Sequence, residues 1–411
     1  MLVVLKRLGG LFRQKELVAI FLMIISADMV SGIFSPTFSL FAASLGASIT
    51  LIGILSSLVG LTRILSSVPI GILSDARGRK GVLMSGMLLF AVSSFLYAVV
   101  KNPYLLIPLR IMTGLVITST FFMGMAYVGD VAKPGDRGLA SGVYTTFMGL
   151  GFSLGSWLGG ELASRFGYTL TFQVAAAIAF LGFFIAWWGL APSVRRDTLQ
   201  QQSQTTVGKL GLLAKEPNLL AASLGFMLVN LMFDAVVVNL FPLYAASLMI
   251  SQVAIGSMFA TRALVSALVR LPTGILTVRF PSKYLMIFAM TLGMVMIFSI
   301  YFLRDPSVLA ILLAGEGICY GMYLTSGQAF ITETYSDTDR GTALGVYSMT
   351  GVIGSTFGPF ILGAVADLWG LQSVFWITSL MVLMGIVLFL YTGFFQPAAR
   401  PLVSPGKSGS L

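Results

Sequence analysis

The sequence contains no histidine and a single cysteine, Cys319, among its 411 residues. These absences exclude metal centres built from Cys and His, Ser-His and Cys-His catalytic dyads, histidine proton switches and an intrachain disulfide. No GxxxxGK[ST] stretch is present either, so the chain has no P-loop with which to bind ATP. We therefore expect neither an enzyme nor a protein that needs a cofactor or metal.

Charge is scarce as well: 10% of the residues are charged and 57% are hydrophobic, and the mean hydropathy is +0.93. A soluble protein of this length would need a larger polar surface. Instead, apolar runs of about 20 residues, each long enough to cross a bilayer as a helix, recur along the chain. The sequence predicts an all-α membrane protein with twelve transmembrane helices, near residues 17–43, 50–74, 81–100, 104–129, 138–160, 168–190, 219–244, 252–277, 283–303, 307–332, 341–366 and 370–395.

The placement of the basic residues predicts the orientation of these spans. Of the 25 Lys and Arg, eighteen fall in loops on the side of the N-terminus, three fall in loops on the other side, and four lie within spans. Cytoplasmic loops of membrane proteins carry such an excess. We therefore expect both termini in the cytoplasm, a multi-pass protein of a prokaryotic inner membrane, and no nucleic-acid partner despite the net charge of +10.

The chain contains two copies of one design. "DRGLASGVY" at 136–144 matches "DRGTALGVY" at 339–347, an offset of 203 residues, and several glycines and prolines recur at the same offset. The expected organisation is an N-terminal six-helix bundle (1–190), a polar cytoplasmic linker (191–218), a C-terminal six-helix bundle (219–395) and a disordered tail (396–411). Two parallel copies of six spans are typical of a transporter built from two bundles.

The loop after the second span carries a recognisable motif, GILSDARGRK at 71–80. Its residues Gly71, Asp75, Gly78, Arg79 and Lys80 match Gly-x-x-x-Asp-x-x-Gly-Arg-Lys. This motif resembles a loop motif of the major facilitator superfamily. Two further stretches, "RIMTG" (110–114) and the glycine-rich "GFSLGSWLGG" (151–160), are similar to other motifs of that family, and the resemblance covers about residues 17–395. Two departures are Thr113 where Gln is usual and Ser156 where Pro is usual.

The resemblance implies that this loop is a cytoplasmic gate. Asp75 would face a helix N-terminus near residues 340–342 in the other half, where the helix dipole favours a carboxylate, and Arg79 would meet Asp130. In the second copy Val278 replaces the acid, so only one such latch is intact. A merely topological role remains the alternative for the basic residues, above all for Arg77.

The glycine-rich fifth span is expected to serve close helix packing, and to let that span slide against the eighth. Its residues are Gly151, Gly155, Gly159 and Gly160, and the repeat copy contributes Gly358 and Pro359.

Seven ionisable residues lie within spans, where each charge costs about 2.5–3.5 kcal/mol and therefore needs a reason. They are Asp28, Arg63, Arg110, Asp234, Arg262, Arg270 and Glu316. They either bind solute and protons or form buried ion pairs that fix helix packing. Without histidine the carboxylates are the candidate proton carriers, Asp28 first. Helical spacing places Asn230 on the face of Asp234, while Glu161 and Asp367 fall at span ends and are expected in solvent.

Three functions remain open at this point. The leading one is a monomeric secondary transporter of the major facilitator type, a proton-coupled antiporter that exports a small amphiphilic or drug-like compound. The second is a proton symporter or facilitator that takes up a sugar or organic acid, favoured by four intramembrane arginines against three acids. The third is a non-transporting membrane receptor on the same fold, although no large appended domain is present.

Overall fold

The structure, a computed structural model, describes residues 2–133, 135–192, 216–336 and 339–395. These residues form helices and connecting turns without a strand. The N-terminal half consists of α1 (Leu2–Leu11), α2 (Lys15–Ser44), α3 (Ile49–Arg77), α4 (Arg79–Tyr97), η1 (Pro103–Leu105), α5 (Leu106–Ile117), η2 (Thr118–Phe122), α6 (Met123–Val131) and α7 (Arg137–Gly189). The C-terminal half consists of α9 (Pro217–Leu231), η3 (Met232–Leu240), α10 (Phe241–Ser247), α11 (Gln252–Arg279), α12 (Ser282–Ile300), α13 (Pro306–Thr334), α14 (Arg340–Trp369) and α15 (Ser373–Phe395).

The twelve predicted crossings are confirmed. Eleven helical segments of the described chain are long and apolar enough to span a membrane. One of them, α7, has 53 residues and contains a break at Gly167, where φ is 77° and ψ is 174°. Because only glycine adopts this conformation readily, the chain turns there and α7 supplies two crossings. Most of the predicted linker and the whole predicted tail lie outside the described residues.

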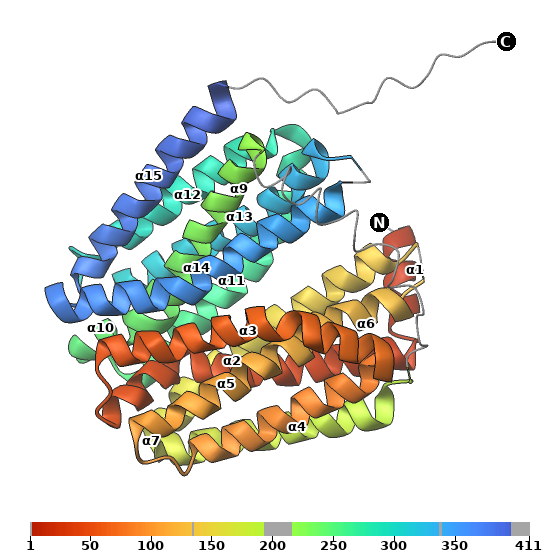
Figure 1. Ribbon diagram of the computed structural model, residues 1–411, viewed down its shortest axis with the longest axis horizontal. Coiled ribbons are helices and arrows are strands. Elements are labelled where there is room, and N and C mark those ends of the chain that lie inside the picture. The colour runs from red at the N-terminus through yellow and green to blue at the C-terminus, as the bar shows by residue number, and fades with distance from the viewer. Residues whose placement is uncertain (1, 134, 193–215, 337–338, 396–411) are drawn as a thin grey trace.

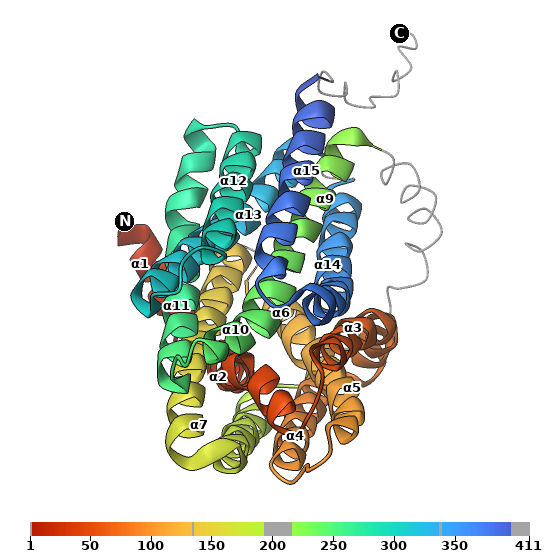
Figure 2. The same cartoon turned by 90° about the vertical axis from the view of Figure 1, so that its left-hand side faces the viewer.

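The two halves form separate bundles (Figures 1 and 2), which meet mainly through two pairs of helices. Helix α3 packs on α14, and α7 packs on α11. Each pair spans the interface; in Figure 2 α7 and α11 lie at the left, and α3 and α14 lie at the right. The buried apolar side chains form one cluster centred on the C-terminal half and two in the N-terminal half, so each bundle has its own core.

The repeat seen in the sequence is visible in local structure. Ser48 accepts a hydrogen bond from the amide of Leu51 and caps α3, and Ser251, 203 residues later, accepts one from Ala254 and caps α11. Gly167 and its counterpart Gly370 both have positive φ, 77° and 85°. The same caps and turns thus end equivalent helices in both copies.

We call the end of the molecule that carries Gly78 the basic end, after its excess of Lys and Arg. In Figure 1 the two bundles lie together near α10 and diverge toward the basic end, where α1 lies. The spacing of glycines agrees. A Cβ atom built at Gly71, Gly142 or Gly345, near the basic end, would meet no described atom within 4 Å, whereas one at Gly160 would meet Gly256 at 2.9 Å. The halves are therefore in contact at the opposite end and separated at the basic end.

Candidate functional site

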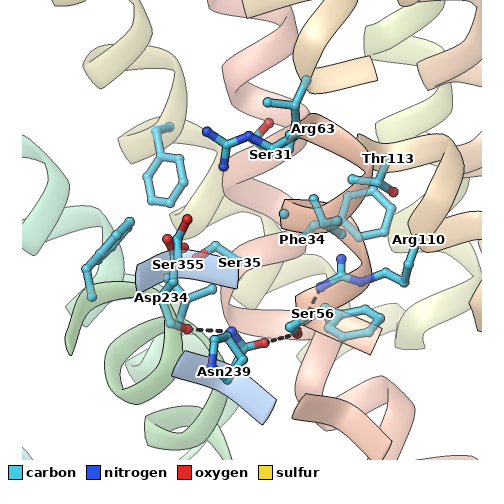
Figure 3. A pocket seen from close by; sticks show the side chains of 18 of the residues that line it. Ser31, Phe34, Ser35, Ser56, Arg63, Arg110, Thr113, Asp234, Asn239 and Ser355 are labelled. Atoms are coloured by element: carbon cyan, nitrogen blue, oxygen red, sulfur yellow. Dashed lines mark hydrogen bonds between the residues drawn. The ribbon is translucent and has the colours of Figure 1, made fainter. Parts of the chain in front are cut away.

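A cavity of about 180 Å³ lies between the two halves (Figure 3). Helices α2, α3, α4, α5 and α7 line one side, and η3 and α14 line the other. Its wall combines five aromatic rings with polar and charged groups, which suits an amphiphilic molecule. The rings are Phe34, Phe38, Phe90, Phe152 and Phe233, and the polar residues are Ser31, Ser35, Ser56, Arg63, Arg110, Thr113, Asp234, Asn239 and Ser355.

A chain of hydrogen bonds crosses the cavity floor from one half to the other (Figure 3). Arg110 donates from Nε to the Leu55 carbonyl (3.2 Å) and from Nη2 to Ser56 Oγ (3.1 Å), and its guanidinium lies 3.6 Å from the ring centre of Phe38. Ser56 in turn donates to Asn239 Oδ1, and Asn239 Nδ2 donates to the main-chain carbonyl of Asp234. Arg110 is thus held by three partners of its own half, and Ser56 connects it to Asn239 of the other half.

Asn239 is not among the residues expected from the sequence, because that expectation rests on an α-helical period. Residues five apart lie about 140° apart around an α-helix at about 100° per residue. Segment η3 is a π-helix, whose wider turn spans five residues, so Asp234 and Asn239 both reach the cavity. The expected neighbour Asn230 instead donates to the Phe226 carbonyl (2.9 Å) and does not line the cavity. Such π-helical turns frequently mark functional sites.

Arg63 and Asp234 face the same cavity from opposite halves. The guanidinium of Arg63 donates no hydrogen bond to the described residues, and its Nε atom is buried. Asp234 lies within the electrostatic influence of three arginines, Arg63, Arg262 and Arg110. The cavity wall therefore contains one carboxylate and two arginines, Arg63 and Arg110. Among the described residues Arg63 has fewer hydrogen-bond partners than Arg110.

A buried ion pair lies behind the cavity wall. Arg262 Nε on α11 donates to Glu316 Oε2 on α13, and the two side chains are 4% and 0% exposed. The guanidinium of Arg262 also stacks on Phe233 (4.1 Å to the ring centre) and on Tyr320 (5.2 Å). Two of the seven predicted residues are thus brought together as an ion pair, the alternative kept for these charges.

Asp28 and Arg270 do not line this cavity. Asp28 is 7% exposed on α2, and within the described chain its carboxylate takes part in no hydrogen bond or ion pair. The charge of Arg270 on α11 acts on Asp28 electrostatically, and Asp28 in turn acts on the hydroxyl of Tyr144. The leading candidate proton carrier therefore lies outside the cavity, in a dry position near the interface.

The glycines of α7 pack mainly against α2, not against α11 as the sliding hypothesis assumed. A Cβ atom at Gly151, Gly155 or Gly159 would collide with the backbone of α2, at Ile25, Met29 and Ile33. Only Gly160 of the four approaches α11, where it meets Gly256. In the second copy, Gly358 packs on Leu231 of α9, and the carbonyl of Pro359 contacts the Gly53 position of α3.

The motif loop is held within the N-terminal half. Arg79 Nε contacts Asp130 Oδ2 at 2.5 Å, and Arg79 Nη2 lies 3.7 Å from Asp75. Lys80 donates to the carbonyls of Trp187 and Leu190, each at 2.7 Å, and so binds the C-terminal end of α7, where the helix dipole favours a cation. Gly78 joins α3 to α4 at φ 89°, and Gly71 has open space beside it. No hydrogen bond or ion pair joins Asp75 to a described residue of α14 in this conformation; its ion pair is with Arg79.

A carboxylate that the sequence analysis left in solvent joins the halves at the opposite end. Asp367, near the end of α14, accepts hydrogen bonds from the amide (2.7 Å) and the hydroxyl (2.5 Å) of Thr50, in the first turn of α3. It therefore caps a helix of the other half. Glu161, at the same end, pairs with Arg165 on its own helix.

The sequence is similar to proteins of known family. The Major Facilitator Superfamily model matches residues 20–247 and 224–409. The uncharacterized MFS-type transporter MJ1560 of Methanocaldococcus jannaschii is 23% identical over 384 residues, 92% of this chain and 98% of that one. The inner membrane transport protein YajR of Escherichia coli is 24% identical over 347 residues (80% and 72%), and the multidrug resistance protein MdtG of Salmonella arizonae is 24% identical over 341 residues (82% and 82%).

The fold is also found among solved structures. A bacterial homolog of the human lysosomal transporter Spinster, in an inward-facing and unoccupied conformation, superposes with a TM-score of 0.81 at 14% identity, covering 93% of this chain and 97% of that one. The family model matches nearly the whole chain. The two six-helix bundles and the cavity between them agree with this match. The chain is a multi-pass membrane transporter, not an enzyme, and it belongs to the Major Facilitator Superfamily.

Proposed function

We propose that this protein is a proton-coupled antiporter that exports a small amphiphilic compound. The observation that carries the proposal is the cavity, to which both halves contribute and whose wall contains five phenylalanine rings and the carboxylate of Asp234. A cationic amphiphile and a proton would compete for this carboxylate, and such competition couples export of one to entry of the other. The multidrug resistance protein among the relatives, although only 24% identical, supports this direction.

The proposed cycle exchanges two helix caps between α3 and α14. The cap of Asp367 on α3 closes the opposite end in the present conformation. We propose that Asp75, at the other end of α3, caps the start of α14 near Arg340 when the basic end closes. Because α3 and α14 are antiparallel partners, forming one cap separates the residues of the other. The moving bodies would be residues 1–190 and 219–395, and the protein would act as a monomer.

The direction of export depends on orientation. The excess of Lys and Arg favours a cytoplasmic basic end, with both termini in the cytoplasm. The cavity would then be approached from the cytoplasm in this conformation. An inner-membrane location is proposed from the same bias and from the name of the relative YajR.

A second candidate is proton-coupled uptake of an organic anion. Arg63 and Arg110 face the cavity together with a single acid, Asp234, which leaves an excess of positive charge. An anion bound to Arg63 would favour a protonated Asp234, because two negative charges in one cavity repel. Anion and proton would then move in the same direction.

One experiment separates the two candidates. Purified protein is placed in liposomes that contain a pH-sensitive dye, no gradient is imposed, and phenyltrimethylammonium or benzenesulfonate is added outside. Export by antiport predicts an alkaline interior with the cation, because solute entry drives protons outward. Symport predicts an acidic interior with the anion. Asp234→Asn should abolish either signal, while Glu161→Gln, which changes an acid of a surface ion pair, should preserve it. A dye signal that is the same in Asp234→Asn as in the wild type would contradict a proton-carrying role for Asp234.

A further inference from the structure

The ion pair behind the cavity is only half satisfied. Arg262 and Glu316 share one hydrogen bond through Nε and Oε2, although an arginine and a carboxylate commonly form two. Arg262 Nη2 and Glu316 Oε1 are both buried without a hydrogen-bond partner. Unpaired polar atoms in a dry interior are costly, so a bidentate pair would be expected if the two residues served only packing.

The surroundings of Arg262 indicate which second carboxylate its charge acts on. Its guanidinium stacks on Phe233, the residue directly before Asp234 on η3, and its charge acts on Asp234. Gly317 admits the backbone and side chain of Arg262 so closely that a Cβ there would clash with both. Arg262 is therefore fixed in contact with Glu316 behind the wall, and it packs on the residue directly before the cavity carboxylate Asp234.

We propose that Arg262 is a positioning residue that divides its charge between Glu316 and Asp234, and thereby sets the pH at which Asp234 releases its proton. The proposal rests on the proposed function in one respect: it assigns a role in proton coupling to a pair that does not touch the solute. Glu316 acts as a counterweight. The more strongly it holds Arg262, the less the ionised form of Asp234 is stabilised.

Other charged and titratable groups face the same two carboxylates. Around Asp234 these are Arg63 on α3, Arg110 on α5, Tyr320 on α13 and the hydroxyl of Ser355 on α14. Around Glu316 they are Tyr320 and Cys319 of its own helix. Among the described residues Arg262 alone forms an ion pair with Glu316 and also acts electrostatically on Asp234, so a change at Arg262 shifts charge from one acid to the other.

Two variants are expected to move the titration of Asp234 in opposite directions. Glu316→Gln removes the counterweight and leaves the full charge of Arg262 to Asp234, so half-protonation of Asp234 should move to lower pH by about one unit. The double variant R262M/E316L replaces the pair by apolar side chains of similar volume, which proteins commonly tolerate. It removes a cation from Asp234, so half-protonation should move to higher pH by about one unit.

The measurement is an infrared titration of the purified protein, in which the band of the protonated Asp234 carboxyl is assigned by its absence in Asp234→Asn. Glu161→Gln is the matched control, and it should leave the titration unchanged because its partner Arg165 is 68% exposed, near the break of α7 at Gly167. If Glu316→Gln does not fold, the double variant alone decides the sign.

A titration of Asp234 that is unchanged in the folded variants, or that moves in the same direction in both, would overturn the proposal and leave the pair a packing device. The readout needs no transport. If the liposome experiment fails but the two opposite shifts appear, the proposed function is wrong and the role of Arg262 stands.

Discussion

The two copies of the repeat share their frame but not their charges. At the end of α3, Arg79 contacts Asp130, and the equivalent positions 203 residues later hold Ser282 and Glu333, which form hydrogen bonds of 3.1 Å. The contact is conserved within the chain, yet an ion pair has become a hydroxyl–carboxylate bond. Val278 stands where the first copy has Asp75.

Packing contacts follow the symmetry more closely. Gly53 and Gly363 approach each other as their counterparts Gly256 and Gly160 do. A tyrosine hydroxyl, from Tyr144 in one copy and Tyr347 in the other, fills the space beside the equivalent glycine, Gly124 or Gly327. The common features pack the helices of each bundle and of the interface, whereas two features found in one copy lie at the cavity: the π-helix η3 lines it, and the pair of Arg262 and Glu316 lies behind its wall.

The largest effect should come from breaking the tighter of the two symmetric glycine contacts. In Gly160→Ala the new Cβ would lie 2.5 Å from the Gln252 carbonyl and 2.9 Å from Gly256, both backbone atoms that cannot rotate away. Overpacking of this kind costs about 3 kcal/mol. The counterpart Gly363→Ala meets its nearest atom at 3.0 Å and should cost less.

The measurement for this pair is thermal unfolding of the purified protein. Gly345→Ala is the control, because open space surrounds that position and alanine favours a helix. Equal destabilisation by Gly160→Ala and Gly345→Ala would show that helix propensity, not the contact between halves, dominates.

A smaller effect is expected where the copies differ in charge. Arg79→Ala removes a guanidinium that is 15% exposed and leaves Asp130, 23% exposed, without this partner. Loss of a hydrogen bond between charged groups costs about 2 kcal/mol. Ser282→Ala removes only a hydroxyl donor from Glu333 and should cost about 1 kcal/mol. Thermal unfolding of both variants tests the order, and a larger loss in Ser282→Ala would contradict it.

The helices and their number followed from composition, because apolar runs of span length have few alternatives in a bilayer. The repeat and the motif loop were also readable, since identical residues recur at a fixed offset. Asn239 was not readable, because a π-helical turn changes the period on which faces are counted. The cap of Asp367 on Thr50 was missed for another reason: it joins residues 317 apart, and nothing local in either segment indicates the other.

The next test concerns the cap of Asp367 on α3, whose counterpart in the proposed cycle is the cap of Asp75 on α14 at the basic end. Asp367→Ala removes an acceptor from the first turn of α3, a loss of about 1 kcal/mol that falls only on the present conformation. The population closed at the basic end should therefore rise about five-fold.

Spin labels at positions 77 and 345, in a chain with Cys319→Ser, would report this change as a larger fraction of short distances. Glu161→Ala, which removes an acid of the same end that pairs within its own helix, is the control. Distances that stay the same in Asp367→Ala would show that the glycine contacts alone hold the opposite end closed.

The smallest effect is expected where the copies differ at a single turn. Gly46 has φ 86°, and its counterpart 203 residues later is Met249, which is forced to φ 61° with its side chain 91% exposed. A left-handed conformation costs a non-glycine residue about 1–2 kcal/mol, and a glycine costs about 0.5–1 kcal/mol in additional chain entropy. Met249→Gly should therefore stabilise the protein slightly, by about 0.5 kcal/mol, and Gly46→Ala should destabilise it by about 1 kcal/mol. Because both turns connect equivalent helices, opposite signs in thermal unfolding would show that backbone strain, and not side-chain contact, separates them; destabilisation by both would show that the methionine side chain contributes a contact of its own.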